Sequence, residues 1–329
     1  MRKTKRKEDV LMGNYFSRKE LVYTVYQEGS ISKAAQKLFV SQPSLSVMIQ
    51  RIEEEVGVPL FDRTSKPIRL TEAGAEYIKA TEEMMHIEKA FDNYLQACQD
   101  LQTGTLTIGS NQLLSSLVLP GYIGKFLDQH PNIHLNLVDD NSVVLENLAM
   151  AGQLDLVLDN HLMDSSIFEQ HILRQEHLLL AVPRNFDCNG GLEQYQFSYD
   201  DVVQGKHLQS SDGYAPLKKF AQVPFVTMTK QNDTRQRSDE ILREAGIKPK
   251  HILEIDRLVT LYRFVEQGTA ASIVSDTLVQ YLQSGGEQVV FYRLKSAYAV
   301  RALYLSYKRN RYYSKAMEAF SSLIRDSVK

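Results

Sequence analysis

The chain has 329 residues, enough for two or three domains that each bury a hydrophobic core. Hydrophobic residues make up 43% and charged residues 24%, as in ordinary soluble proteins. No apolar run approaches the roughly 20 residues of a membrane-spanning helix. Two cysteines, Cys98 and Cys188, are too few for a disulfide framework or a structural zinc site. These features exclude a membrane protein and a disulfide scaffold, and we expect neither a cofactor nor a metal ion.

The formal net charge of −2 is unevenly distributed. Residues 1–80 contain 14 Lys and Arg against 10 Asp and Glu, a balance of +4, so the remainder carries −6. A basic head on an acidic body suits a protein that touches nucleic acid at one end. Residues 1–11 are a basic extension without periodicity, which we expect to be a flexible leader rather than an arm on DNA. Because this N-terminus lacks the apolar stretch of a signal peptide, we expect a cytoplasmic protein.

Three short helices are predicted between residues 17 and 56. Ser17 and Glu20 fit a capping box, and Gly29 ends the first helix. A second helix follows over about residues 32–38, and its two adjacent alanines suit the close crossing of helices. Together they predict the first half of a helix-turn-helix.

The third helix begins at Ser41, has Pro43 in its first turn and ends at Gly57. Its apolar residues recur on one face, so the opposite, polar face is free to enter the major groove of DNA, where Gln and Ser bind base edges. A short basic hairpin follows and would place cations beside phosphates as a wing. The predicted DNA contacts are Ser32, Gln42, Pro43, Ser44, Ser46, Val47, Gln50, Arg51, Arg63, Lys66 and Arg69. The alternative is an ordinary polar surface on a small helical domain.

Several short motifs stand in order over this region: Ser30 to Leu38, Ser41 to Ser46, and Gly57 to Gly74. Residues 12–75 resemble the winged helix-turn-helix head of the LysR-type transcriptional regulators. Val47 and Met48 stand where that family often carries Arg and Gln. The resemblance implies a dimeric regulator of transcription that responds to a ligand, with RNA polymerase as a candidate further partner and tetramers as a candidate assembly.

Residues 76–103 predict a long linker helix, because they contain neither Pro nor Gly before the hinge at 103–104. A repeat of 3.5 residues indicates the seam of a coiled coil, whereas a helix lying on its own domain would show a broader stripe. The predicted dimerisation residues are Tyr77, Ala80, Met84, Ile87, Phe91, Tyr94, Cys98 and Leu101. Two heads joined in this way would read an inverted repeat.

Residues 104–329 alternate strands and helices, which predicts a two-lobed α/β domain. We expect a helix over 113–126 with Pro120 near its middle, and a strand over 289–292 that returns to the first lobe. Lobe I would comprise 104–177 and 288–329, and lobe II 178–287. The domain resembles the effector domain of the same family, which is similar to periplasmic solute-binding proteins. The predicted fold class is therefore a multidomain α+β protein.

Polar residues follow several predicted strands at the point where a helix begins. In α/β sheets, ligands bind at the carboxyl ends of strands, and helix N-termini favour anions, so a small organic anion is the expected effector. The candidate effector-binding residues are Ser110, Asn111, Gln112, Ser142, Thr229, Thr234 and Thr269. The alternative for each one singly is helix capping.

These patterns favour a DNA-binding transcriptional regulator that forms homo-oligomers and binds a small-molecule effector. A plain solute-binding protein would not need the helix-turn-helix. An enzyme is not expected, because the sequence has no Gly-rich phosphate loop, Gly-x-Ser-x-Gly elbow, His-Glu-x-x-His pair or Cys-x-x-Cys motif. An architectural DNA-binding protein without an effector would leave over 200 residues without a role.

Overall fold

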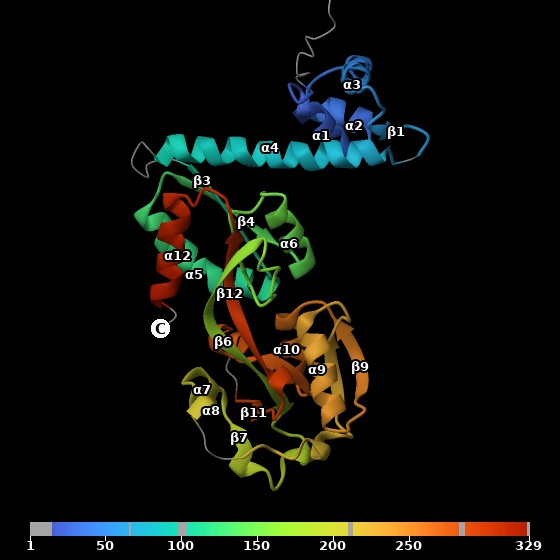
Figure 1. The fold of residues 1–329 in the computed structure, drawn as a ribbon. Coiled ribbons are helices and arrows are strands. Elements are labelled where there is room, and N and C mark those ends of the chain that lie inside the picture. Colours follow the sequence, from blue (N-terminus) through green and yellow to red (C-terminus); the bar gives the residue numbers. More distant parts are fainter. Residues whose placement is uncertain (1–14, 66, 98–103, 210–212, 283–286, 328–329) are drawn as a thin grey trace, which may run out of the picture. The chain divides into compact units, whose positions relative to one another are not determined.

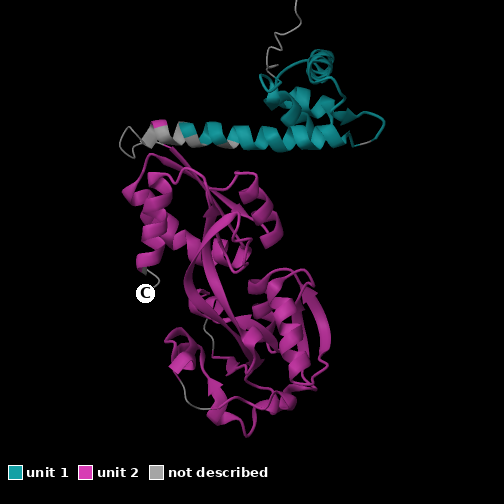
Figure 2. Ribbon diagram, in the orientation of Figure 1, with its two compact units in different colours: residues 1–92 teal, residues 93–329 magenta. Residues whose placement is uncertain are grey.

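A computed structural model describes residues 15–65, 67–97, 104–209, 213–282 and 287–327. It divides into two compact units, residues 1–92 and residues 93–329 (Figure 2). The predicted extension over residues 1–11 lies outside the described part of the chain. Within that part, no helix combines the length and the apolar character that crossing a membrane requires.

The first unit is a helix-turn-helix with a short wing, as predicted (Figure 1). Ala34 and Ala35 are buried where the first two helices cross, and the absence of longer side chains lets the backbones approach. Branched residues of the first and third helices close the core. The elements are α1 (Lys19–Glu28), α2 (Ile31–Lys37), α3 (Gln42–Val56) and the antiparallel wing strands β1 (Phe61–Asp62) and β2 (Arg69–Leu70).

The predicted capping box at the first helix is wrong. Helix α1 begins at Lys19 after Arg18, without a side-chain cap, and Ser17 lies in the preceding turn. The carbonyl of Phe16 accepts the Lys19 N–H at 3.2 Å, and the Phe16 ring stacks on Tyr77 with centroids 4.8 Å apart. Packing of this aromatic pair therefore fixes the chain ahead of the helix.

Helix α4 (Glu72–Ala97) starts inside the head and continues beyond its core. Tyr77 and Ile78 are buried among the residues of the first three helices. A Cβ on Gly74 would lie 1.9 Å from the carbonyl oxygen of Leu60, so only glycine allows the helix to start so close to the wing.

Lobe I of the second unit is built on parallel strands with helices on both faces. On one face Phe126 meets Phe320 edge-on at 5.3 Å between ring centroids, and on the other Leu145 and Ala149 are buried. The elements are β3 (Gly104–Ser110), η1 (Leu114–Val118), α5 (Leu119–Gln129), β4 (Ile133–Asp139), α6 (Ser142–Met150), β5 (Leu156–Asp159) and α12 (Lys315–Ser327).

The expected helix over 113–126 is confirmed, and it contains a π-helical turn. The backbone stays helical from η1 through Val118 into α5 at Leu119, and Pro120 lies in the first turn of α5, just after the π-helical turn. Proline has no N–H and fits the first turn of a helix, whereas it would break a hydrogen bond in the interior.

Two long strands connect the lobes: β6 (Phe168–Pro183) and β12 (Val300–Lys308) (Figure 1). They pair antiparallel from Phe168↔Lys308 to His177↔Val300, and the remaining half of β6 pairs with strands of lobe II. Strand β6 therefore belongs to both lobes, and the stretch around His177 and Val300 is the hinge.

Lobe II adds strands to the far half of β6 and a separate parallel pair. Its strands are β7 (Gln196–Phe197), β8 (Pro224–Met228), β9 (Lys250–Ile255), β10 (Ser272–Ser275) and β11 (Val289–Arg293). Its helices are η2 (Asp187–Asn189), η3 (Glu193–Tyr195), α7 (Tyr199–Val203), α8 (Lys206–Gln209), η4 (Leu217–Phe220), α9 (Asp233–Glu244), α10 (Leu258–Glu266), α11 (Asp276–Tyr281) and η5 (Ala297–Ala299).

The predicted lobe boundary at residue 288 is wrong, because β11 stays in lobe II. It pairs with β6 from Val289↔Pro183 to Arg293↔Leu179 and also with β7. Phe291 and Tyr292 enter two different cores on the two faces of the sheet. The chain returns to lobe I only with β12. The sequence did not show this, because a strand buried on both faces lacks the alternation of polar and apolar residues that marks one exposed face.

Candidate functional site

The exposed face of α3 is held in place by its buried face. Ser41 caps the helix and accepts the Ser44 N–H at 3.3 Å, and Leu45, Ile49 and Ile52 are buried in the core of the head. Three residues of the opposite face are exposed at the start of the helix, Gln42, Pro43 and Ser44, and Val47 is 50% exposed. Polar side chains are thus presented from a rigid helix.

The other predicted DNA contacts lie at or near the surface. Ser32, Gln50, Arg51, Arg63 and Arg69 are exposed and Ser46 is half-buried, while Lys66 lies outside the described residues. The Gln50 amide donates to Glu54 at 3.1 Å, so this bond must open before the amide contacts a base.

Glu53 orients the wing. Its carboxylate accepts the Leu60 and Phe61 N–H groups at 2.9 and 3.1 Å and the Arg63 guanidinium at 2.7 Å. Hydrogen bonds from Thr64 to the Asp62 carboxylate hold the pKa of Asp62 below its ordinary value. Glu53 therefore neutralises part of the charge of Arg63, and the Arg63 guanidinium stays partly exposed, where a phosphate could bind.

The first predicted seam residue of α4, Tyr77, packs within the head itself. Tyr77 is buried in the head, where its hydroxyl donates to the carbonyl of Tyr15 at 2.7 Å, so it is not a free seam residue. Ile87 and Phe91 are 66% and 58% exposed. Met84 is exposed and Ala80 half-buried, whereas the Tyr94 side chain, Cys98 and Leu101 lie outside the described part.

The carboxyl ends of β3, β4 and β5 form the polar edge of lobe I. Ser110 is fully buried and donates to the carbonyl of Leu158 at 2.8 Å, so its hydroxyl stabilises the sheet. The Asn111 amide donates to Asp159 at 2.7 Å. Gln112 and Ser142 are half-buried at the same edge, where Asn141 caps α6.

The corresponding edge of lobe II follows β8. Thr229 is half-buried there, and Thr234, in the first turn of α9, is buried. Thr269 is not part of this edge. Because β8 and the segment at Ala271 run parallel, Thr269 lies at the amino end of the strands, opposite Thr229. Thr269 was therefore placed wrongly from the sequence.

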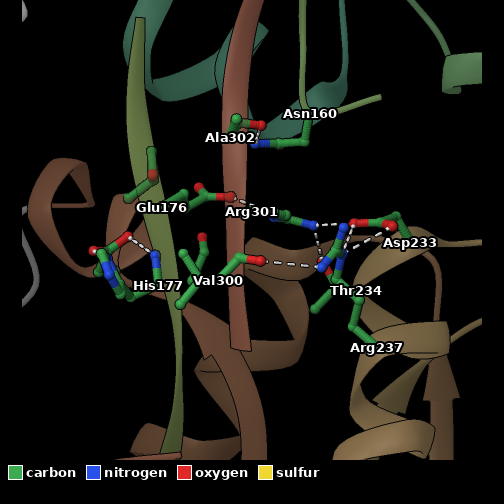
Figure 3. A network of polar contacts seen from close by, with 12 residues as sticks. Asn160, Glu176, His177, Asp233, Thr234, Arg237, Val300, Arg301 and Ala302 are labelled. Carbon is green, nitrogen blue, oxygen red and sulfur yellow. Dashed lines mark hydrogen bonds and ion pairs between the residues drawn. The ribbon is translucent and has the colours of Figure 1, made fainter. Parts of the chain in front are cut away.

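A buried ion-pair network joins lobe II to the hinge (Figure 3). Arg301 of β12 donates to Glu176 of β6 at 2.5 Å, to Asp233 at 2.7 Å and to Thr234 at 3.1 Å. We call these four residues the hinge network. Next to it, Asn160 of lobe I donates to the carbonyl of Ala302 at 3.2 Å. The polar edges of both lobes therefore meet β12 at neighbouring residues.

The electrostatics of this region are mixed. Burial disfavours the guanidinium charge of Arg301, but the carboxylates of Glu176 and Asp233 outweigh it and raise the pKa of Arg301. Burial raises the pKa of Asp139 in lobe I, and the charge of Arg257 in lobe II opposes this shift. Charges of the two lobes therefore act on one another. Among the described residues, no group of three or more His, Cys, Asp and Glu could hold a metal ion.

Of the hinge network, sequence reasoning found Thr234 but missed Glu176, Asp233 and Arg301, and it also missed Asp159, the partner of Asn111. Glu176 and Arg301 stand far apart in the chain, and each lies in a strand that carries other charged residues. Their neighbours along the strands are partly exposed, so no local pattern signalled that these two charges are buried as a pair.

A helix-turn-helix head on a two-lobed α/β domain defines a DNA-binding protein with a ligand-sensing domain. Two family models match the chain: the bacterial regulatory helix-turn-helix protein of the lysR family over residues 17–75, and the LysR substrate binding domain over residues 99–329. The chain belongs to the LysR family, whose members are transcriptional regulators with a DNA-binding head and an effector-binding domain.

Relatives and solved structures agree with this assignment. The "Probable RuBisCO transcriptional regulator" of Trichormus variabilis is 27% identical over 304 residues, 90% of this chain and 83% of that protein. The "Uncharacterized HTH-type transcriptional regulator YcgK" of Bacillus subtilis is 26% identical and matches over 94% of both chains. A cysteine-to-aspartate variant of full-length OxyR from Pseudomonas aeruginosa has a TM-score of 0.64 at 19% identity, covering 94% of this chain and 93% of that chain. CbnR, a LysR family transcriptional regulator, has a TM-score of 0.61 at 18% identity, covering 95% and 99%. The predicted fold is confirmed.

Proposed function

We propose that this regulator binds an inverted DNA repeat as a dimer, with one α3 helix in each major groove. The observation that carries the proposal is the exposed polar face of α3, which is fixed by the buried Leu45, Ile49 and Ile52. CbnR, whose fold the chain shares, has been crystallised with its target DNA. We also propose that the dimer forms through α4. The protein would act in the cytoplasm, with RNA polymerase as a further partner.

Gln42 tests the DNA interface. We expect Gln42→Ala to weaken binding to a duplex recovered by genomic footprinting by about 1–3 kcal/mol, because a bidentate base contact is lost. The matched control is Gln36→Ala, at an exposed position of α2. Fluorescence anisotropy at physiological salt measures both. Equal affinities for the duplex and for random DNA would overturn the proposal.

We further propose that the effector is a small organic anion that binds between the polar edges of the two lobes. The N-termini of α6 and α9 lie at these edges, and helix N-termini favour negative charge. Asp233 already supplies one carboxylate to Arg301 at the N-terminus of α9. An effector carboxylate would compete for the same positive region and change how α9 is held at the hinge.

Thr229 and Thr269 provide a matched pair for this proposal. Thr229→Val removes a hydroxyl at the polar edge, and we expect the affinity for an activating acid to fall about tenfold, as for loss of a hydrogen bond to a charged group. Thr269→Val makes the same change at the opposite end of the strands and should leave binding unchanged. Isothermal titration with a panel of small carboxylates measures both, and equal effects of the two variants would refute the location.

A further inference from the structure

A pocket lies in lobe II beside the hinge, and its lining includes none of the residues of the polar edges. It has a volume of about 480 Å³, within the range of pockets that hold small molecules. Polar and charged side chains line it, together with leucines, alanines and a valine; they are His177, His207, Tyr214, Arg293, Lys295 and Ser296. None of these residues belongs to the predicted effector site.

The pocket and the hinge network occupy opposite faces of the same strand pair. His177 and Val300 line the pocket and are partners in the register of β6 and β12. The next pair along, Glu176 and Arg301, belongs to the hinge network. Successive side chains of a strand point to opposite faces. A molecule in the pocket would therefore contact the hinge on the face opposite to the hinge network.

The charges around the pocket favour an anion. Its described lining residues include Arg293 and Lys295 but neither Asp nor Glu. Arg293 donates to the carbonyl of Gly213 at 3.0 Å, and its guanidinium lies 4.9 Å from the centre of the Tyr214 ring. Lys295 is exposed, so its ammonium is free to move toward a bound carboxylate.

His207 is held in the wall of the pocket by Asp276. Its residue is 2% exposed, and its Nε2 lies 3.3 Å from the Asp276 carboxylate. The other ring nitrogen, Nδ1, is buried and has no hydrogen-bond partner among the described residues. Because Nδ1 has no accessible surface, a ligand in the pocket gains no hydrogen bond from it, and recognition depends on the cations of the wall.

Part of the remaining wall is apolar. Leu208, Tyr214 and Val300 present apolar surface to the pocket, beside Ser296. This surface suits a hydrocarbon or aromatic body rather than a phosphate or a sugar, because burying hydroxyl groups without partners is unfavourable.

We propose that lobe II carries a second small-molecule site that takes an organic acid with an apolar body. The carboxylate binds near Arg293 and Lys295, and the body packs on Leu208 and the ring of Tyr214. This site is distinct from the one proposed between the lobes, and it gives the regulator a second chemical input at the hinge.

Isothermal titration of the full chain with phenylacetate and hexanoate tests the proposal. Lys295→Gln should weaken binding of the bound acid about tenfold, and Ala297→Phe, which adds a ring at an exposed pocket residue, should abolish it. Lys250→Gln, at an exposed position of β9, is the matched charge control and should have no effect.

Thr229→Val separates the two sites. Binding that survives Thr229→Val but is lost in Ala297→Phe supports the lobe II site. Binding lost in Thr229→Val and unchanged in Lys295→Gln and Ala297→Phe overturns it and leaves the proposed effector site standing. Absence of binding by both acids at millimolar concentration also overturns it.

Discussion

Arg301 shows how one side chain can hold two lobes together. Its guanidinium is buried and binds carboxylates from β6 and from α9 at once. The pair with Glu176 is removed from water, so the loss of one partner leaves an uncompensated charge in the interior. The pair with Asp233 is partly exposed and contributes less.

We therefore predict that Arg301→Met lowers the free energy of unfolding by about 3–5 kcal/mol. Adding Glu176→Gln to this variant should restore part of the loss, because the unpaired charge is gone. Urea denaturation measures the cycle. The control is Arg243→Met, which breaks an exposed, solvent-screened pair with Glu240 and should cost far less. Similar losses for the two arginines would contradict the role of burial.

Asp276 makes stability depend on pH. Burial alone would raise its pKa, but hydrogen bonds from His177 and His207 outweigh burial and hold the pKa well below the ordinary 3.8. A depressed carboxylate pKa contributes stability above the unfolded value, and this stability is lost as the pH falls below 3.8 toward the folded value.

At neutral pH we predict that Asp276→Asn costs about 1–3 kcal/mol, as for a charged hydrogen-bonded group. The difference between the variant and the wild type should shrink as the pH falls below 3.8. Urea denaturation across this range measures it, with the exposed Asp256→Asn as control. A difference that stays constant with pH would exclude the proposed linkage.

At the level of single residues, the sequence predicted the role of a side chain when its hydrogen-bond partner lies only a few residues away. Ser41 is the cap of α3, as expected, because its partner lies three residues away. Ser110 differs, since its partner is Leu158 of a neighbouring strand, and no local pattern shows that its hydroxyl faces the sheet. The partner of Arg301 is equally distant in sequence.

Among the elements, α4 serves two structures in succession. Its first turns bury Tyr77 and Ile78 in the head, and its later turns expose Ile87 and Phe91. The heptad pattern showed which residues are apolar but not where the core of the head ends. Large apolar side chains at seam spacing on an exposed helix are typical of a contact between copies.

We predict that Ile87→Glu combined with Phe91→Glu raises the dissociation constant of the dimer at least tenfold, because burial of each side chain contributes about 1.5–3 kcal/mol. Sedimentation equilibrium measures the change. Lys79→Glu, at an exposed position off the seam, is the control and should leave the dimer intact. A dimer equally stable in all variants would show that copies associate elsewhere.

For the whole molecule, the proposed dimer would carry two heads, and these would impose a spacing on the DNA. Half-sites read from one side of the duplex stand a whole number of helical turns apart, about 10–10.5 base pairs each. We predict that inserting about 5 base pairs between the half-sites lowers affinity to that of one half-site, since the second half-site then faces away. Inserting a full turn should restore part of the affinity, and gel-shift titration of the three duplexes measures this. Equal affinities would exclude simultaneous binding.

The overall architecture followed from the sequence more readily than the arrangement of strands. The motifs of the head fall within one short segment, so their order alone predicts the helix-turn-helix. Lobe II is different, because β11 is buried on both faces and its apolar run does not show which sheet it joins. The sequence also could not separate the candidate effector residues Thr229 and Thr269. Both flank strands, and only the direction of the strands shows that they lie at opposite ends.

The shared strand β6 has a consequence for how the sensing domain comes apart. Strand β6 supplies backbone hydrogen bonds to both lobes, so unfolding of one lobe removes ordered strand that the other lobe pairs with. Heat should then melt the two halves together, and amide protons midway along this strand should exchange with solvent only when the entire domain opens.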